Sequence, residues 1–406
     1  MSIEHITNLI QQEKERQDKE LSLIASENYA SKNVLEASAS ILTNKYAEGY
    51  PGKRYYAGNE IIDQIENFAI EQAKILFDTD YHVNVQPYSG SPANLAAYSA
   101  LLQPGDTVLA MSLAHGGHLT HGHPVSITGK LYKFIHYGVN KETELIDYDE
   151  VLELAKTYHP KLIVCGTTAY PALVDFTAFS RIARQVGAWL MVDMAHISGL
   201  IAGKAYPSPF GIADIITSST HKTLRGPRSG IIFCRPEFSQ AIDKAVFPGL
   251  QGGPHMNTIA AMAVAFIEAQ QPSFRLYAKQ VIANAQSMAY YLQQQGFRLV
   301  ADGTDSHLLL LDLTTTGIRG KEAQELLEEA GIICNKNALP FDQNPPMNPS
   351  GLRFGTPAVT TRGLKERDME ELSGLISDTL TRKRTPAEIR VTIESLAKKY
   401  RIPLFH

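Results

Sequence analysis

The sequence predicts an α/β protein with a mostly parallel central sheet in a large domain and a smaller α+β domain towards the C-terminus. From about residue 105, short apolar runs rich in β-branched residues alternate with amphipathic helical stretches, which is the pattern of βαβ units. The length of 406 residues exceeds what one ordinary core accommodates. Pro272 follows an apolar helical stretch, and mixed helices and strands come after it. We therefore expect an N-terminal helix over residues 1–22, a large domain over 23–272 and a small domain over 273–406.

The predicted elements follow in regular order along the chain. Five apolar runs predict strands at Asp106–Ser112, Lys161–Gly166, Ala188–Asp193, Ala213–Ser218 and Gly230–Cys234. Apolar residues at helical spacing predict helices over Pro92–Leu102, Asp149–Tyr158, Thr177–Gly187 and Asn257–Gln270, with Asp149 and Thr177 as N-caps. In the small domain, the same patterns predict helices over Phe274–Gln295 and Lys321–Ala330 and a strand over His307–Leu313. Because open α/β sheets bind ligands beyond the carboxyl ends of their strands, functional residues are expected there.

Composition and charge are those of a globular enzyme. A net charge of −4 and a pI near 6.4 give no electrostatic reason to expect nucleic acid or an anionic membrane as a partner. The three cysteines are isolated along the chain and form no disulfide framework, which fits the reduced cytosol. The first residues lack the basic start and apolar block of a signal peptide, and no apolar run reaches about 18 residues. We expect a cytoplasmic protein.

Lys222 lies just past the end of a predicted buried strand. Desolvation disfavours the charged form of an amine held there, so Lys222 is placed to attack an aldehyde and form a Schiff base. A solvated loop lysine is the ordinary alternative. Asp193 ends a neighbouring strand, where a carboxylate either keeps a pyridine nitrogen protonated or caps the residues that follow. His196, three residues later, is expected to orient that carboxylate.

The segment Ser89-Gly90-Ser91 precedes a predicted helix, so hydroxyl groups and backbone amides meet at a helix N-terminus. Such a terminus suits an anion such as phosphate, although an ordinary capped loop explains the same residues. Neither a Gly-x-Gly-x-x-Gly fingerprint nor a Gly-x4-Gly-Lys-[Ser/Thr] loop occurs in the sequence. The two commonest rival phosphate binders are therefore absent.

Four histidines, His115, His118, His121 and His123, surround Gly116-Gly117. A zinc site is the weaker interpretation, because no Cys or carboxylate lies at a recognised spacing and the glycines interrupt any helix. We expect no metal; a single imidazole stacked on a cofactor ring, with glycines that allow close backbone approach, explains the pattern better.

Arg353 lies in a strand-like stretch of the predicted small domain. Its guanidinium group is suited to clamp a substrate carboxylate, and a structural ion pair is an equal alternative. Tyr46 and Glu48 occur in an aromatic, glycine-rich loop without a packing pattern, and such loops often carry function.

Six strings, in order between residues 23 and 254, resemble the serine hydroxymethyltransferase family, and the resemblance covers nearly the whole chain. They are LIASEN at 23–28, NKYAEGYPGKRYYAGNE at 44–60, LAHGGHLTHG at 113–122, VDMAHISGL at 192–200, THKTLRGPR at 220–228 and VFPGLQGGP at 246–254. The resemblance implies the fold of a fold-type I pyridoxal-phosphate transferase, similar to aspartate aminotransferase. It also implies pyridoxal 5'-phosphate bound as a Schiff base on Lys222, with tetrahydrofolate as cosubstrate. The implied reaction converts L-serine and tetrahydrofolate reversibly to glycine and 5,10-methylenetetrahydrofolate through an aldimine and Cα–Cβ cleavage.

The resemblance assigns roles to individual residues. Catalytic roles are implied for Lys222, Glu48, Asp193, His118 and Tyr56. Cofactor binding is implied for a larger set: Tyr46, Ser89, Gly90, Ser91, His118, Thr168, Asp193, His196, Ser219, His221, Lys222, Gly252 and Gly253. The amino acid is implied to contact Ser26, Glu48, Tyr56 and Arg353, and the folate to contact Leu113, Gly117, His118, Leu119 and Asn337.

The resemblance further implies a homo-oligomer, with a dimer expected, in which some residues complete the site of the neighbouring subunit. These residues are Tyr46, Glu48, Tyr56, Gly252 and Gly253. The sequence departs from the usual family residues at a few positions: Ala57, Tyr88, Pro92, Thr168, Ser219 and Ser229. Two alternatives stay open, a folate-independent aldolase for β-hydroxy amino acids and a catalytically silent cofactor-binding protein. The intact Lys222, Asp193, Arg353 and Glu48 argue against the silent protein.

Overall fold

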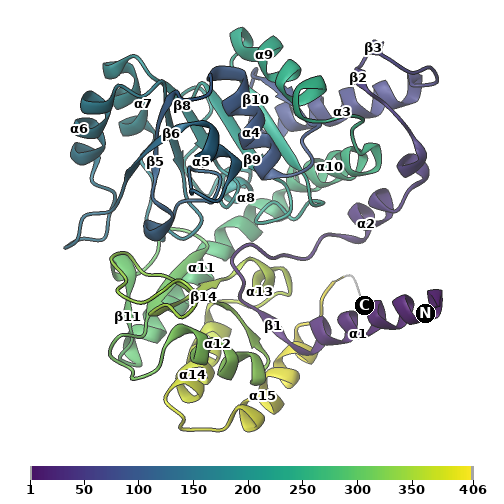
Figure 1. Cartoon of the computed structure of the whole chain (residues 1–406). Helices are drawn as coiled ribbons and strands as arrows, with labels where there is room; N and C mark the ends of the chain where they lie inside the picture. Colours follow the sequence, from purple (N-terminus) through teal and green to yellow (C-terminus); the bar gives the residue numbers. More distant parts are fainter. Residues whose placement is uncertain (1, 404–406) are drawn as a thin grey trace. The chain divides into compact units, whose positions relative to one another are not determined.

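The computed structural model describes residues 2–403 and divides into two compact units (Figure 1). Unit 1 comprises the described residues up to Tyr29, the segment Pro171–Leu173 and the residues from Gln280 onwards. Unit 2 comprises Ala30–Tyr170 and Val174–Lys279. This division differs from the sequence-based one in two respects. The N-terminal helix belongs to the same unit as the C-terminal residues, and the second boundary falls inside helix α11 (Pro272–Gln294) rather than at Pro272.

Unit 2 is built on a seven-stranded sheet with the order β4-β10-β9-β8-β7-β5-β6. Strand β10 runs antiparallel to β4 and β9, and the other neighbouring pairs are parallel. The strands are β4 (His82–Asn84), β5 (Thr107–Met111), β6 (Lys133–Tyr137), β7 (Leu162–Gly166), β8 (Trp189–Asp193), β9 (Ile215–Ser219) and β10 (Gly230–Cys234). All five predicted strands are present, with ends that differ by at most two residues. Strands β4 and β6 were not predicted.

Helices cover this sheet, with α4 against β9 and β10 and α7 against β7 and β8. The helices of unit 2 before α11 are α2 (Lys32–Ser38), α3 (Glu60–Phe77), α4 (Gly90–Leu101), α5 (Ile127–Leu131), α6 (Tyr148–Tyr158), α7 (Phe176–Val186), α8 (Ser198–Ala202), α9 (Ser239–Lys244) and α10 (Met256–Ala269). Asp147 and Asp175 cap α6 and α7 by accepting first-turn amides. The predicted caps Asp149 and Thr177 are wrong, because each lies inside the first helical turn.

Unit 1 contains a four-stranded antiparallel sheet with the order β11-β12-β15-β14. Its strands are β11 (Arg298–Leu299), β12 (Leu308–Asp312), β14 (Asn335–Asn337) and β15 (Gly351–Gly355), and β1 (Leu21–Ser22) pairs in parallel with β13 (Ile332–Ile333). The helices are α1 (Ile3–Lys19), α12 (Gly320–Glu329), α13 (Pro357–Thr361), α14 (Glu366–Leu380) and α15 (Pro386–Lys399). Buried leucines and isoleucines of the sheet and of α12, α14 and α15 form its core.

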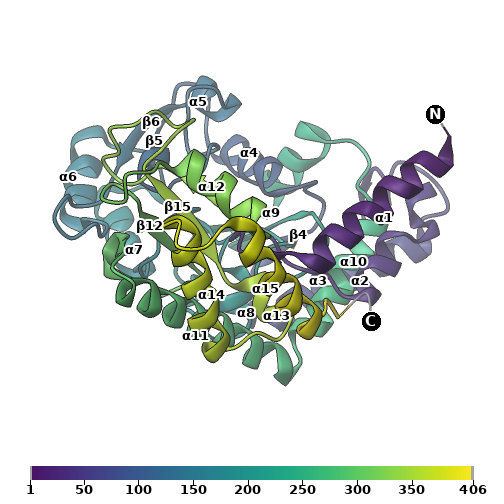
Figure 2. The ribbon, with the colours of Figure 1, turned by 90° about the horizontal axis from the view of Figure 1, so that it is seen from below.

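Arg362 attaches helix α1 to the rest of unit 1, where α1 lies beside α15 (Figure 2). The buried guanidinium group donates to backbone carbonyls at the C-terminal ends of these two helices, those of Gln17, Asp18, Glu20, Ala397 and Tyr400. A cation is favourable at a helix C-terminus because the helix dipole is negative there. Helix α1 is therefore held against α15 within unit 1. Within residues 2–403, no helix combines the length and the apolar character needed to span a membrane.

Candidate active site

The carboxyl ends of β8 and β9 carry the central residues of the predicted site. Strand β8 ends at Asp193, which pairs in parallel register with Thr217 of β9. Strand β9 ends at Ser219, and Lys222 follows three residues later. Because the carboxyl ends of parallel strands meet at one edge of a sheet, Asp193 and Lys222 lie at the same edge.

Asp193 accepts hydrogen bonds from three directions. Its Oδ2 accepts from Nδ2 of Asn94 at 2.8 Å and from Nε2 of His121 at 3.2 Å, and its Oδ1 accepts the backbone N–H of Ala195 at 3.1 Å. Burial by itself raises the pKa of this carboxyl group, but the hydrogen bonds from His121 and from the Asn94 amide help to outweigh burial, so the pKa is lowered. Asp193 is therefore a carboxylate at neutral pH.

A histidine that was not expected in this role contacts Asp193. Sequence reasoning gave the role to His196, and the structure places His121 against the carboxylate. The backbone carbonyl of His196 accepts the hydroxyl of Thr223 at 2.9 Å, which ties the loop of Lys222 to the segment after β8. In the sequence, His121 stands out only as a member of the four-histidine cluster, and Asn94 belongs to no motif. Neither is identifiable from sequence spacing, because they lie 72 and 99 positions from Asp193.

His118 is a neutral imidazole close to both charged residues of the site. Burial lowers its pKa to about 4; the charge of Asp193 opposes this shift, and the charges of His121 and Lys222 add to it. Its Nδ1 lies 2.7 Å from Oγ1 of Thr120. The ring packs edge to face on His121 at a centroid distance of 5.7 Å. A fixed, uncharged ring is suited to stack on an aromatic cofactor.

The two glycines before His118 form a turn that side chains would disrupt. Gly116 has a φ of +109°, and a Cβ on Gly117 would lie 2.2 Å from the carbonyl oxygen of Met111. The hydroxyl of Thr168 donates to the Gly117 carbonyl at 2.8 Å. The predicted folate residues Leu113 and Leu119 flank the turn and are 40% and 47% exposed. The glycines thus permit close approach to the protein's own backbone.

The residues predicted to hold a phosphate gather at the start of α4. Ser89 is the N-cap, and Gly90 and Ser91 form the first turn, whose amide groups point out of the helix. A Cβ on Gly90 would lie 3.6 Å from the Cβ of Ser219, so the turn lies next to the end of β9. The structure therefore brings Ser89, Gly90 and Ser91 to the end of β9, the strand that Lys222 follows.

His221 adds an unsatisfied nitrogen to this region. Among the described residues, none is hydrogen bonded to its buried Nδ1. Burial and the neighbouring charges of Lys222 and Arg228 lower the pKa of His221 to about 3. A helix N-terminus, two cations and an unsatisfied imidazole nitrogen are together suited to an anion, so the residues present fit the phosphate of pyridoxal phosphate.

A second group of predicted residues lies on an exposed face of unit 2, near the β2 (Gly49–Tyr50) and β3 (Lys53–Arg54) hairpin (Figure 1). Tyr46 donates its hydroxyl to Glu48 at 3.2 Å and packs edge to face on Tyr56. A Cβ on Gly252 would lie 3.1 Å from Glu48 Oε1, and one on Gly253 would lie 3.6 Å from the ring of Tyr46. The tyrosines are 56% and 49% exposed. Segments 200 residues apart in the sequence thus form one cluster.

A buried ion-pair network fixes the backbone on both sides of Glu48. Arg54 donates to the carbonyls of Ala47 and Gly49 at 2.8 Å each. The same guanidinium group pairs with Asp63 at 2.8 Å and with Glu66 at 2.6 Å. The network positions the main chain that carries Glu48, although the carboxylate itself lies outside it.

Three predicted residues lie in unit 1. Arg353, in β15, donates from Nε to Oδ1 of Asn335 at 3.1 Å, and burial lowers its pKa to about 10, so it stays a cation at neutral pH. Asn337, in the neighbouring β14, pairs with Gly351. Ser26 follows Ala25, against which the far end of β15 packs. Unit 1 therefore contains a partly buried cation, Arg353, together with the predicted residues Asn337 and Ser26.

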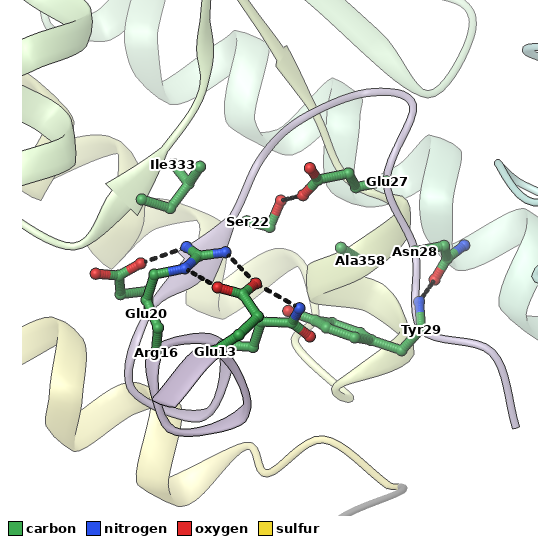
Figure 3. A pocket seen from close by; sticks show the side chains of 10 residues that line it. Glu13, Arg16, Glu20, Ser22, Glu27, Asn28, Tyr29, Ile333 and Ala358 are labelled. Atoms are coloured by element: carbon green, nitrogen blue, oxygen red, sulfur yellow. Dashed lines mark hydrogen bonds and ion pairs between the residues drawn. The ribbon is translucent and has the colours of Figure 1, made fainter. Parts of the chain in front are cut away.

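Unit 1 also holds a separate polar cavity of about 230 Å³ beside α1 (Figure 3). Arg16 lies between Glu13 and Glu20 and pairs with both at 2.7 Å. Glu27 accepts the hydroxyl of Ser22 at 2.7 Å. Hydrogen bonds from Arg16 and Gln17 lower the pKa of Glu13 to about 2. The charges of this cavity are engaged with one another and link α1 to the segment that follows it.

The chain is similar to known proteins over nearly its whole length. A family model described as serine hydroxymethyltransferase matches residues 1–376. A protein named serine hydroxymethyltransferase from Koribacter versatilis (strain Ellin345) is 55% identical over 403 residues, which cover 98% of this chain and 94% of that protein. The chain belongs to the serine hydroxymethyltransferase family. A relative of the same name from Coprothermobacter proteolyticus is 55% identical over 397 residues, covering 97% of this chain and 95% of the relative.

Membership confirms the fold-type I assignment and the predicted enzyme class. The protein is a pyridoxal-phosphate-dependent transferase that converts L-serine and tetrahydrofolate to glycine and 5,10-methylenetetrahydrofolate. The aldolase and silent-protein alternatives are not favoured by any feature of the site. Over residues 2–403, no group of three or more His, Cys, Asp and Glu side chains is arranged to hold a metal ion.

Proposed function

We propose that the residues at the carboxyl ends of β8 and β9 carry out this reaction, with Lys222 as the residue that binds the cofactor aldehyde. One observation supports this proposal above the others. Asp193 ends β8 and Lys222 follows the end of the adjacent parallel strand β9, so the acid and the amine lie at one edge of the sheet. When bound, pyridoxal phosphate supplies an electron sink for the bond that breaks at the amino-acid Cα.

The protein residues set the position and protonation of the cofactor. Asp193, ionised and held by three donors, keeps a proton on the pyridine nitrogen. His118 stacks on the ring, and the remaining cofactor residues surround the phosphate or the ring substituents. These are Ser89, Gly90, Ser91, Thr168, His196, Ser219 and His221.

Arg353 binds the carboxylate of the substrate amino acid in this proposal. A guanidinium group offers two parallel donors to a carboxylate. Burial disfavours the unpaired charge of Arg353, so pairing with an anion stabilises it. Ser26 and Tyr56 contribute the neighbouring polar contacts. Because Arg353 contacts the amino acid and not the cofactor in this proposal, its loss should raise KM for serine more than the dissociation constant for pyridoxal phosphate.

Glu48 carries the proton that moves between the hydroxymethyl oxygen, the folate and the departing group. The hydroxyl of Tyr46 donates to its carboxylate at 3.2 Å, which holds the side chain in place. The folate lies against Leu113, Gly117, His118, Leu119 and Asn337 in this proposal.

We further propose a homodimer, located in the cytoplasm, in which the exposed cluster of Tyr46, Glu48 and Tyr56 completes the neighbouring subunit's site. Gly252 and Gly253 add backbone groups to the same cluster. Half-exposed tyrosines beside a carboxylate are unusual on a free surface, and a second copy would cover them. Glu48 and Lys222 of one site then come from different chains.

Replacement of the lysine tests the central assignment. Lys222→Ala should abolish serine cleavage and the visible absorbance of bound pyridoxal phosphate while the circular dichroism stays native. The matched control is Lys204→Ala, which removes an exposed loop lysine of the same unit and should leave both unchanged. An active Lys222→Ala protein would remove the proposal.

Mixed dimers test whether the site is shared. Lys222→Ala and Glu48→Gln proteins, each inactive alone, are unfolded together and refolded as a mixture. If Glu48 serves the neighbouring chain, each hybrid has one intact site, and the mixture recovers about a quarter of wild-type activity. If both residues serve the same chain's site, no hybrid has an intact site and the mixture stays inactive.

A further inference from the structure

Asn94 lies at the centre of the buried hydrogen bonds around Asp193. It is in the second turn of α4 and is 2% exposed. Its Oδ1 accepts the hydroxyl of Thr217 at 2.6 Å. Its Nδ2 donates to Oγ1 of Thr120 at 2.9 Å and to Oδ2 of Asp193 at 2.8 Å. One amide side chain thus contacts three elements of the site.

The chemistry of its partners fixes which way this amide points. Asp193 is a carboxylate that receives two other donors, so the atom of Asn94 that faces it must carry hydrogen. The same nitrogen faces Thr120, whose hydroxyl oxygen therefore acts as an acceptor. On the opposite side, Thr217 must donate its proton to the amide oxygen.

The direction of donation continues from Thr120 to His118. Because the Thr120 oxygen accepts from Asn94, its own proton is free for Nδ1 of His118, 2.7 Å away. The backbone N–H of Thr120 also points at this nitrogen, at 3.2 Å. Nδ1 of His118 is therefore an acceptor, and the neutral ring carries its proton on Nε2.

His121 has the same tautomer for an independent reason. The backbone N–H of His118 donates to Nδ1 of His121 at 3.3 Å. The ring proton of His121 is therefore on Nε2, directed at Asp193. This second histidine does not depend on Asn94, which makes it an internal reference.

We propose that Asn94 is a positioning residue that fixes, through one amide, both the orientation of Asp193 and the tautomer of His118. This inference rests on the proposed function, in which Asp193 meets the ring nitrogen of the cofactor and His118 covers the ring. Asn94 then determines the hydrogen-bond state of both groups before the cofactor binds. The carboxylate of Asp193 cannot rotate without moving Nδ2 of Asn94, which also donates to Thr120. The ring of His118 cannot move its proton to Nδ1, because Thr120 donates to that nitrogen.

Histidine tautomers of the apoenzyme provide the direct test. The ring ¹³C and ¹⁵N shifts of selectively labelled histidine distinguish Nε2–H from Nδ1–H, and His118→Gln and His121→Asn proteins assign the two signals. In the wild type, both rings should be Nε2–H. In Asn94→Asp, a carboxylate takes the proton of Thr120, so the His118 signal should move towards the Nδ1–H or doubly protonated form.

Two further variants keep the test decisive if Asn94→Asp folds poorly. Thr120→Val removes the link to His118 alone and should change the His118 signal while that of His121 stays Nε2–H. The matched control is Asn84→Asp, because Asn84 is also buried and donates to a carboxylate, that of Asp243, at 2.8 Å. This control should leave both histidine signals unchanged.

A second readout uses the cofactor. The dissociation constant for pyridoxal phosphate should rise about 10- to 100-fold in Asn94→Leu, the loss expected for a hydrogen bond to a charged group. Unchanged Nε2–H signals of His118 in folded Asn94→Asp and Thr120→Val proteins would overturn the proposal. Failure of the proposed function would instead appear as an active Lys222→Ala protein, with the apoenzyme tautomers unaffected.

Discussion

Acidification of the apoenzyme should expose the unusual state of His118 as a loss of stability. The folded protein holds this ring neutral, with a pKa of about 4, because burial disfavours the imidazolium form. In the unfolded chain, histidine binds a proton with a pKa near 6.5. Since the unfolded state takes up the proton first, stability is lost as the pH falls from 6.5 towards 4. At pH 8, both states are neutral and the group has no effect.

The size of this loss follows from the two pKa values. At pH 5, the unfolded chain gains about 2 kcal/mol from protonation of this histidine, and the folded protein gains almost nothing. His118→Gln removes the titrating group. The difference in the free energy of unfolding between pH 8 and pH 5 should therefore be about 2 kcal/mol smaller in His118→Gln than in the wild type.

Urea unfolding of the two apoenzymes at both pH values, at equal protein concentration, measures this double difference. All other titrating groups are common to both proteins, so their contributions cancel to first order. His5→Gln, which replaces an exposed histidine of α1, serves as the control and should keep the wild-type loss. An equal loss in wild type and His118→Gln would show that the ring is not held neutral and would refute the reasoning.

Three further predictions concern the supports of the site and of unit 1. Arg362→Met should lower the free energy of unfolding by about 3–5 kcal/mol, because five backbone carbonyls lose their donor, two of them in buried hydrogen bonds. Arg382→Met, at an exposed ion pair, should cost about 0–1 kcal/mol in the same denaturation assay. Gly117→Ala should destabilise the protein by about 1–3 kcal/mol, because the new Cβ would lie 2.2 Å from the carbonyl oxygen of Met111. The control Gly374→Ala, where the new Cβ meets open space, should be neutral or stabilising in thermal unfolding. Glu48→Gln should lower kcat for folate-dependent serine cleavage about 10²- to 10⁴-fold with little change in cofactor affinity, and an equal loss of both would contradict the proton-transfer role.

The elements that could be predicted from the sequence are those with a continuous physical signal. Strands β7 and β9 are buried throughout and therefore read as unbroken apolar runs. Strand β6 lies at the edge of the sheet and has exposed residues at Lys133 and His136, so its sequence shows no such run. Strand β4 has only three residues. The caps of α6 and α7 were missed by two residues because several Asp and Thr side chains compete near each helix start.

The site shows a similar division between local and long-range information. Asp193 and Lys222 were identified because they lie at or just past the ends of buried strands. Ser89 was identified from a predicted helix start, Glu48 from a glycine-rich loop and Arg353 from a strand-like stretch, and the family resemblance then assigned their roles. The partners of Asp193 could not be found in this way, since a hydrogen bond between residues 72 or 99 positions apart leaves no periodic pattern. The attachment of α1 to unit 1 was missed for the same reason: Arg362 meets α1 across about 340 residues of sequence.

The hydrogen bonds around Asp193 have a direction, and this direction explains which substitutions should matter most. Donation runs one way, from Thr217 to Asn94, from Asn94 to Asp193 and Thr120, and from Thr120 to His118. Each member has its donor and acceptor sites matched to its neighbours, so the buried charge of Asp193 is fully compensated. An isosteric change that reverses one donor, such as Asn94→Asp, places two acceptors face to face in a buried site. An apolar change such as Asn94→Leu removes the three hydrogen bonds of the amide without adding repulsion between acceptors, so the polar replacement should be the more damaging.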